Sequence, residues 1–220
     1  MSIQTNLSNI RTELPSHVTL VAVSKTKPIE DLLQAYQSGQ RVFGENKIQE
    51  MAEKYQKMPK DIQWHMIGNI QRNKVKYMAS FVDLVHGVDS LKLLNEINKQ
   101  AEKNKRIINC LIQIKIAQEN TKFGMSFDEA KNLISSKEVK KLKNISIVGI
   151  MGMASFTQDK TQIKKEFKTL KSNFDDLQKM ASNLMILSMG MSGDYTLAIE
   201  NGSTMIRLGS SIFGARNYTN

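Results

Sequence analysis

The sequence predicts a (β/α)8 TIM barrel of the α/β class, built as a single domain with one extra helix before the first strand. Short apolar, β-branched runs alternate with longer amphipathic stretches almost from end to end, which is typical of repeated βα units and a parallel sheet. Eight such runs in 220 residues favour a closed barrel over an open sheet. No Pro/Gly/Ser-rich linker divides the chain, so we expect residues 1–220 to form one domain.

The predicted strands are short and rich in Val, Ile and Leu. An open doubly wound sheet is the alternative arrangement, but its first strand is usually followed by a glycine-rich phosphate loop. Here that place holds Ser24-Lys25-Thr26-Lys27-Pro28. The eight strands are expected at Thr19–Ser24, Arg41–Gly44, Ile62–Ile67, Phe81–Val88, Ile107–Ile114, Ser146–Met151, Leu184–Leu187 and Thr204–Leu208.

Amphipathic stretches between these runs predict the helices. The first of them carries a proline in its first turn, where the missing N–H costs nothing. Ser2–Glu13 is expected to form the extra helix. The other main candidates are Pro28–Gly39, Ile48–Lys57, Ser90–Asn104 and the long Asp159–Ala181.

The net charge of +10 raises the question of a nucleic-acid partner. The lysines are interleaved with acidic residues in helical stretches such as Lys137–Lys143 and Lys164–Lys171, as on solvated helix faces. Only 6% of residues are aromatic, and no zinc finger or RNP-like aromatic pair is present. We therefore expect no dedicated nucleic-acid binding, while the positive charge favours a phosphorylated small ligand.

The single cysteine, Cys110, lies in the apolar segment Ile107–Ile116. This position predicts a buried, inert thiol, and a single cysteine excludes an internal disulfide. The count of cysteine and histidine ligands predicts no structural zinc, and we expect no other metal site. No charged start precedes an apolar run, and no stretch of about 18 apolar residues occurs. A cytoplasmic protein without a membrane span is expected.

Function in a barrel is expected at the C-terminal ends of the strands, because the βα loops form its broad concave face. The loops after the last two strands, a recurrent phosphate site in this architecture, are rich in Gly and Ser. Ser188, Gly209 and Ser210 could converge there on a phosphate, with ordinary turn chemistry as the alternative.

Two cations lie at strand ends. Lys25 directly follows the first apolar run, so its amine is expected in a mouth walled by apolar residues, where an unprotonated amine could condense with an aldehyde. A plain surface charge is the alternative. Arg207 ends the last strand. There it is expected either to form a structural salt bridge or to donate a hydrogen bond to a heterocycle nitrogen. One ligand with an aldehyde and a phosphate would satisfy both ends of such a site.

Several long blocks of sequence, in the same order along nearly the whole chain, resemble the YggS/PROSC family of pyridoxal 5′-phosphate (PLP) homeostasis proteins. These blocks are Leu20–Pro28, Phe43–Asn46 with Gln49 and Glu50, Trp64–Gly68 with Gln71, Asn73 and Lys74, Leu187–Ser192, and Gly202–Arg216.

The resemblance implies a fold-type III PLP barrel, like that of alanine racemase but without that enzyme's second domain. By the same resemblance, Lys25 holds PLP as an aldimine and Arg207 faces the pyridine nitrogen. Asn46 lines the pocket near the ring, and the phosphate is held by Ser188, Gly209 and Ser210. The implied function is PLP binding in vitamin B6 homeostasis without robust catalysis, so no catalytic residue is assigned. PLP-dependent apo-enzymes are possible recipients, and we expect a monomer.

Two positions depart from the family pattern. The segment Ile114–Gly124 keeps a Lys-x-Gly end but lacks the Asn-led start expected after the fifth strand. Ser210 stands where threonine is common, which preserves the hydroxyl.

Two enzymes remain as alternatives. An amino-acid racemase needs acid/base groups on both faces of PLP. Lys25 could serve one face, whereas the related racemases bring a tyrosine from another domain and this chain ends at Asn220, which leaves Tyr195 and Tyr218 as candidates. A Schiff-base aldolase for sugar phosphates would need a proton shuttle in the barrel mouth, for which Glu45 is the evident candidate.

Overall fold

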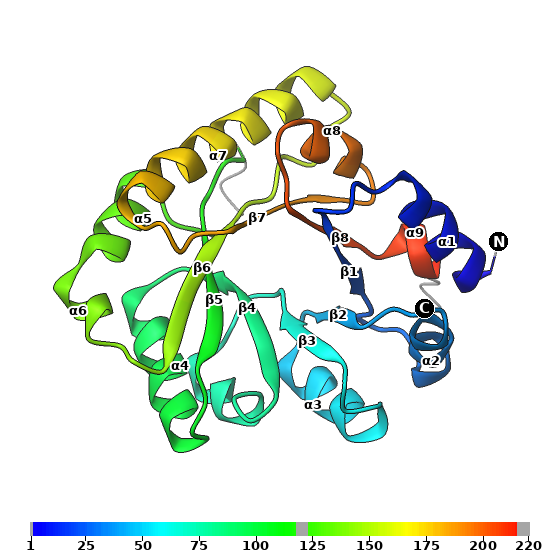
Figure 1. The fold of residues 1–220 in the computed structure, drawn as a ribbon, viewed down its shortest axis with the longest axis horizontal. Coiled ribbons are helices and arrows are strands. Elements are labelled where there is room, and N and C mark those ends of the chain that lie inside the picture. The colour runs from blue at the N-terminus through cyan, green and yellow to red at the C-terminus, as the bar shows by residue number, and fades with distance from the viewer. Residues whose placement is uncertain (1, 118–122, 215–220) are drawn as a thin grey trace.

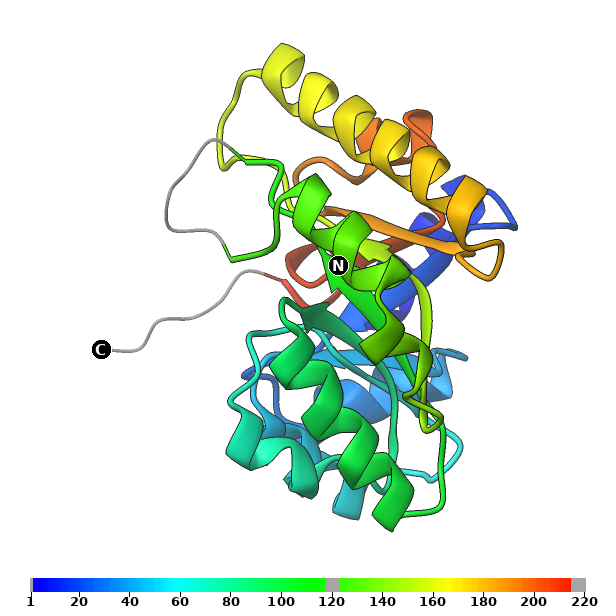
Figure 2. The ribbon, with the colours of Figure 1, turned by 90° about the vertical axis from the view of Figure 1, so that its left-hand side faces the viewer.

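A computed structural model describes residues 2–117 and 123–214 of the chain. In these residues, eight parallel strands form a closed barrel in sequence order, and the first strand pairs with the last (Figure 1). The helices lie outside the strands, and the longest of them runs along the outside of the barrel in Figure 2. The (β/α)8 TIM barrel predicted from the sequence is confirmed.

The strands begin and end close to the predicted positions, with one exception. Leu184–Leu187 was expected as strand 7, but the strand runs from Ile186 to Met191, so the prediction that Ser188 lies in the loop after it was wrong. Ser188 pairs with residues of both neighbouring strands, and its hydroxyl has partners inside the barrel. The strands are β1 Thr19–Val23, β2 Val42–Glu45, β3 Gln63–Met66, β4 Val82–Val88, β5 Ile108–Gln113, β6 Ile145–Met151, β7 Ile186–Met191 and β8 Met205–Leu208.

The predicted helices are also present, several of them one residue shorter at the N-terminal end. Ser2, Ser90 and Asp159 cap their helices from outside, because each side chain accepts a hydrogen bond from a backbone N–H of the first turn. The helices are α1 Ile3–Glu13, α2 Ile29–Gln37, α3 Ile48–Lys57, η1 Arg72–Tyr77, α4 Leu91–Lys103, α5 Phe127–Ser135, α6 Lys137–Lys140, α7 Lys160–Met180, α8 Tyr195–Glu200 and α9 Ser210–Phe213.

The extra helix α1 packs beside α2 and α9 (Figure 1). The side-chain amide of Asn6 donates to the carbonyl of Ile212 at 2.9 Å, which ties α1 to α9. This contact steadies the short helix that begins directly after β8, at the edge where the sequence predicts a phosphate site.

Apolar side chains form two layers. The larger one lies between strands and helices and includes the fully buried Phe43, Trp64 and Phe167. The smaller joins residues of strands on opposite sides of the barrel, so it fills the barrel interior. Its buried members are Val21, Leu84, Leu111, Met151 and Met205.

In the described part of the chain, no helix is both long and apolar enough to cross a membrane. Cys110 is fully buried in β5, and burial raises the pKa of its thiol far above the ordinary range. The thiol therefore stays protonated and unreactive, as the sequence predicts.

Candidate functional site

Lys25 lies on a tight turn at the C-terminal end of β1. The turn is closed by the Lys27 N–H, which donates to the carbonyl of Ser24 at 3.0 Å. Thr26 has a φ of 64°, a left-handed conformation that is strained for a β-branched residue. Such strain persists where the surroundings enforce it, and it is often found at functional sites.

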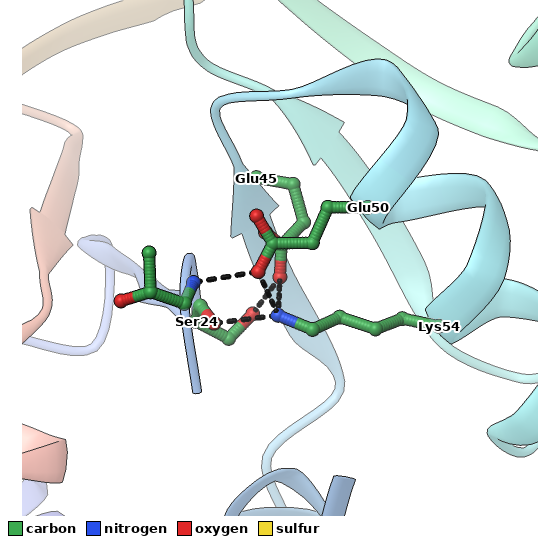
Figure 3. A network of polar contacts seen from close by, with 5 residues as sticks. Ser24, Glu45, Glu50 and Lys54 are labelled. Carbon is green, nitrogen blue, oxygen red and sulfur yellow. Dashed lines mark hydrogen bonds and ion pairs between the residues drawn. The ribbon is translucent and has the colours of Figure 1, made fainter. Parts of the chain in front are cut away.

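A buried ion network enforces this turn (Figure 3). The Lys54 ammonium, from α3, donates to the backbone carbonyl of Ser24 at 2.7 Å. It also contacts carboxylate oxygens of Glu45 at 2.8 Å and Glu50 at 2.7 Å. The Ser24 hydroxyl donates to Glu45 and the Thr26 N–H donates to Glu50, both at 2.6 Å. The backbone is therefore held on both sides of Lys25.

Glu45 is fully buried and engaged in this network. Burial raises the pKa of its carboxyl above the ordinary value, although Lys54 and Ser24 act in the opposite direction. Its second carboxylate oxygen has no hydrogen-bond partner among the described residues. Glu45 thus supports the Lys25 turn. This role argues against the aldolase hypothesis, which required Glu45 as a proton shuttle.

Sequence reasoning did not identify Glu50 and Lys54 as site residues. Their spacing of four in a helix is a recognisable ion-pair pattern. That pattern usually marks a solvated helix face. Only the packing of α3 against β2 turns it toward the interior.

Arg207 points into the barrel from β8. Its guanidinium donates to the Ser188 hydroxyl at 2.6 Å and to the carbonyl of Gly152 at 3.2 Å. Among the described residues it forms no salt bridge, which was the structural alternative for this position. Burial lowers the pKa of Arg207 to about 10, with the Asp194 carboxylate opposing that shift, so the side chain remains a cation at neutral pH.

Gly209 and Ser210 lie where β8 turns into α9. The backbone N–H groups of Gly209 and Ser211 both point at the hydroxyl of Ser192, at 3.3 and 3.4 Å. A Cβ on Gly209 would lie 3.3 Å from the carbonyl of Val23, so α9 begins directly against the end of β1. This cluster of amides and hydroxyls is next to the Lys25 turn.

Ser192 was not among the predicted site residues, although it lies in one of the sequence blocks that carry the family resemblance. Ser188 belongs instead to the interior of the barrel, through its bond to Arg207. A role for the Ser188 hydroxyl on a phosphate stays a prediction.

Asn46 follows β2 and is partly buried. A Cβ on Gly68 would lie 2.4 Å from the carbonyl oxygen of Asn46, so glycine is required for the two loops to meet. The fold thereby brings Asn46, Lys25, Gly209 and Ser210 to the same end of the barrel, on loops that follow β2, β1 and β8.

Tyr195, one of the two tyrosines considered for a racemase, is engaged away from this site. The Tyr195 hydroxyl, on α8, donates to a carboxylate oxygen of Glu13 at 3.4 Å on the outer helix α1. Tyr218 and Arg216 lie outside the described residues, as do residues 118–122 of the atypical segment after β5.

The family follows from comparison with known proteins. A profile of the alanine racemase N-terminal domain matches residues 1–217. The chain belongs to this family. Its relatives in this family include a pyridoxal phosphate homeostasis protein from Pasteurella multocida, which is 38% identical over 100% of both chains. Another, from Schizosaccharomyces pombe, is 39% identical over 91% of this chain and 85% of that protein. The resemblance seen in the sequence is confirmed.

Solved structures agree with this family assignment. PipY of Synechococcus elongatus PCC7942 with PLP bound is 31% identical, with a TM-score of 0.88 over 97% of this chain and 100% of PipY. PipY without PLP gives a TM-score of 0.91 at 32% identity. Alanine racemase of Clostridium difficile 630 shares the barrel at 17% identity, with a TM-score of 0.79, and this chain covers 57% of it. The last likeness concerns the fold alone.

Proposed function

We propose that this protein binds PLP through Lys25 and serves in PLP homeostasis as a binding and carrier protein without robust catalysis. The observation that carries the proposal is a lysine on a braced turn after β1, beside a cluster of backbone N–H groups at the start of α9. The same fold, at 31% identity over nearly the whole chain, is found in PipY with PLP bound.

The residues present fit the parts of PLP. Bound PLP would supply an aldehyde carbon that accepts an amine, and Lys25, on the turn after β1, is the residue proposed to provide that amine. Donors from the start of α9 and from Ser192 suit the phosphate. Among these, Gly209 contributes its N–H and close approach, and Ser210 contributes an exposed hydroxyl.

The ring of PLP would be held from two sides. Arg207 supplies a permanent donor that suits an unprotonated pyridine nitrogen, which weakens the ring as an electron sink. Asn46 lines the pocket from the loop after β2. An unprotonated ring nitrogen suits storage of PLP better than amino-acid chemistry.

A racemase is the second candidate, because its barrel is shared. It requires a second acid/base group opposite Lys25. Within residues 2–117 and 123–214, Tyr195 is turned toward Glu13. We therefore favour the carrier role, in a monomeric cytoplasmic protein whose residues 1–220 act as one PLP-binding domain. PLP-dependent apo-enzymes are the proposed recipients.

The decisive experiment combines loading with an exchange assay. Purified protein mixed with PLP should develop a visible absorbance band. Borohydride should convert the bound PLP to a stable adduct, and peptide mass mapping should place that adduct on Lys25. In heavy water, a panel of amino acids should then keep their α-protons. Rapid α-proton exchange would favour the racemase, and a colourless protein trapped only with a sugar phosphate would favour the aldolase.

Arg207→Glu should raise the protonated fraction of the pyridine nitrogen. A carboxylate can accept a hydrogen bond from the protonated nitrogen, whereas a guanidinium group can only donate one. We expect a shifted spectrum of bound PLP and weaker binding, by about tenfold for a lost charge-assisted contact. Arg207→Gln, which carries no charge, should give a smaller shift. An unaltered cofactor spectrum and affinity in both variants would refute the contact.

A further inference from the structure

A line of buried polar side chains crosses the interior of the barrel below Arg207. The Ser188 hydroxyl contacts Nδ1 of His86, on β4, at 3.3 Å. Nε2 of His86 lies 3.1 Å from Nδ1 of His65, on β3. Together with the bond from Arg207 to Ser188, these contacts link four strands. Burying a polar group without a partner costs free energy, so each of these side chains is stabilised by the hydrogen bond to its neighbour.

The line ends on a carboxylate that reaches solvent. Nε2 of His65 lies 3.7 Å from a carboxylate oxygen of Asp83, whose side chain is 45% exposed. In the pairing of β3 with β4, Trp64 is opposite Val82. The next pair is His65 with Leu84, which leaves Asp83 as an extra residue on β4. Such a bulge redirects a side chain, here toward His65.

The direction of the hydrogen bonds follows from the chemistry of the two ends. Guanidinium can only donate, so the Ser188 oxygen accepts from Arg207 and its own hydrogen is left for Nδ1 of His86. Burial, with His65 and Arg207 nearby, holds the pKa of His86 well below its ordinary value. The ring is therefore neutral, and its hydrogen must lie on Nε2, which donates to His65.

The same reasoning applies to His65. Burial lowers the pKa of this ring, although Asp83 opposes the shift, so it is also neutral. Its Nδ1 accepts from His86, and its hydrogen lies on Nε2, toward Asp83. The His65 contact holds the pKa of the Asp83 carboxyl below its ordinary value, which keeps that group an acceptor. The reverse order of donors would set a ring lone pair against the carboxylate.

We propose that His86 and His65 are positioning residues for Arg207. Together with Ser188 they form a one-directional chain of hydrogen bonds whose last ring faces the Asp83 carboxylate at 3.7 Å, and this chain sets how the guanidinium meets the ring nitrogen of bound PLP. The contact between Arg207 and the ring nitrogen of PLP rests on the proposed function. The order of donors in the chain does not, because it is a property of the protein without PLP.

Nitrogen NMR of the PLP-free protein tests the order of donors. The chain has three histidines, and the third, His17, is exposed and serves as an internal reference. We expect His65 and His86 both to be neutral with the hydrogen on Nε2. Asp83→Ala should shift the Nε2 resonance of His65 while the contact with His86 keeps its tautomer, whereas Asp176→Ala on the outer helix α7 should change neither. Hydrogen on Nδ1 of His86, or a charged ring at neutral pH, would overturn the proposal.

Titration with PLP tests the effect on Arg207. His86→Leu breaks the chain, and we expect it to weaken PLP binding about tenfold and to shift the bound spectrum in the same direction as Arg207→Gln. His86→Gln can both accept from Ser188 and donate to His65, so it should restore the spectrum and most of the affinity. Thermal unfolding of each variant checks that it is folded.

The outcomes separate the two proposals. If the unmodified protein forms no reducible adduct with PLP, the proposed function fails, and the NMR result still decides the order of donors. If PLP binds and Arg207→Gln changes its spectrum while His86→Leu leaves spectrum and affinity unchanged, only the positioning role is overturned. If His86→Gln behaves like His86→Leu although both are folded, a relay through this position is also contradicted.

Discussion

Lys25→Ala should abolish the covalent attachment of PLP completely. The variant removes the Lys25 amine from the braced turn between Ser24 and Lys27, where the amine of Lys27 instead donates to the carbonyl of Phe213 at 2.8 Å. We expect the borohydride-stable adduct to disappear while weak, reversible PLP binding persists through the amides at the start of α9. Difference absorbance and intact mass after reduction measure the two kinds of binding separately.

Lys47→Ala is the matched control for this experiment, because Lys47 is exposed and lies on the neighbouring loop after β2. It should keep both the adduct and its stoichiometry. If reduction still yields one PLP adduct per chain of Lys25→Ala, the assignment of the lysine is wrong. Peptide mapping would then identify the amine that carries it.

Lys54→Met should be the most destabilising substitution at the site. It leaves the buried Glu45 carboxylate without its cation and frees the Ser24 carbonyl, and breaking a buried ion pair from one side costs about 3–5 kcal/mol. The Lys25 turn loses its support at the same time. We expect a marked loss in the free energy of unfolding by denaturant and weaker PLP binding in the molecules that remain folded.

The loss should depend on pH in a defined direction. Burial raises the pKa of Glu45 in the folded protein, so the folded state binds this proton more readily than the unfolded chain does. The contribution of such a group to stability falls as pH rises from its ordinary pKa through the raised folded value. Without Lys54 the pKa rises further. The difference in stability between variant and parent should therefore be greatest at neutral pH and shrink toward about pH 4.

Lys57→Met, on the exposed face of the same helix, provides the comparison. It removes an equal charge without touching Glu45 and should change stability by less than about 1 kcal/mol at any pH. A pH-independent loss in Lys54→Met, or a loss no greater than that of Lys57→Met, would show that the network does not brace the turn.

The pattern of the sequence was sufficient for the barrel, for most strand bounds and for the position of Lys25 at a strand end. Local chemistry explains this, because apolar periodicity and helix caps such as Ser90 act over a few residues. The bound of β7 was misjudged for a related reason. Ser188 and Gly190 look like turn residues in a linear reading, but inside a barrel a serine with a partner is a normal strand residue.

By itself, the sequence determined the fold class, the family and the elements from which the site is built. Tertiary structure alone decided which polar residues meet: Lys54 with Glu45 behind Lys25, and His86 with Ser188 below Arg207. These partners are between 9 and 102 positions apart in the chain, and they come together only when the barrel closes. Pairing across a closed sheet depends on register and on bulges such as the one at Asp83, and neither leaves a periodic mark in the sequence.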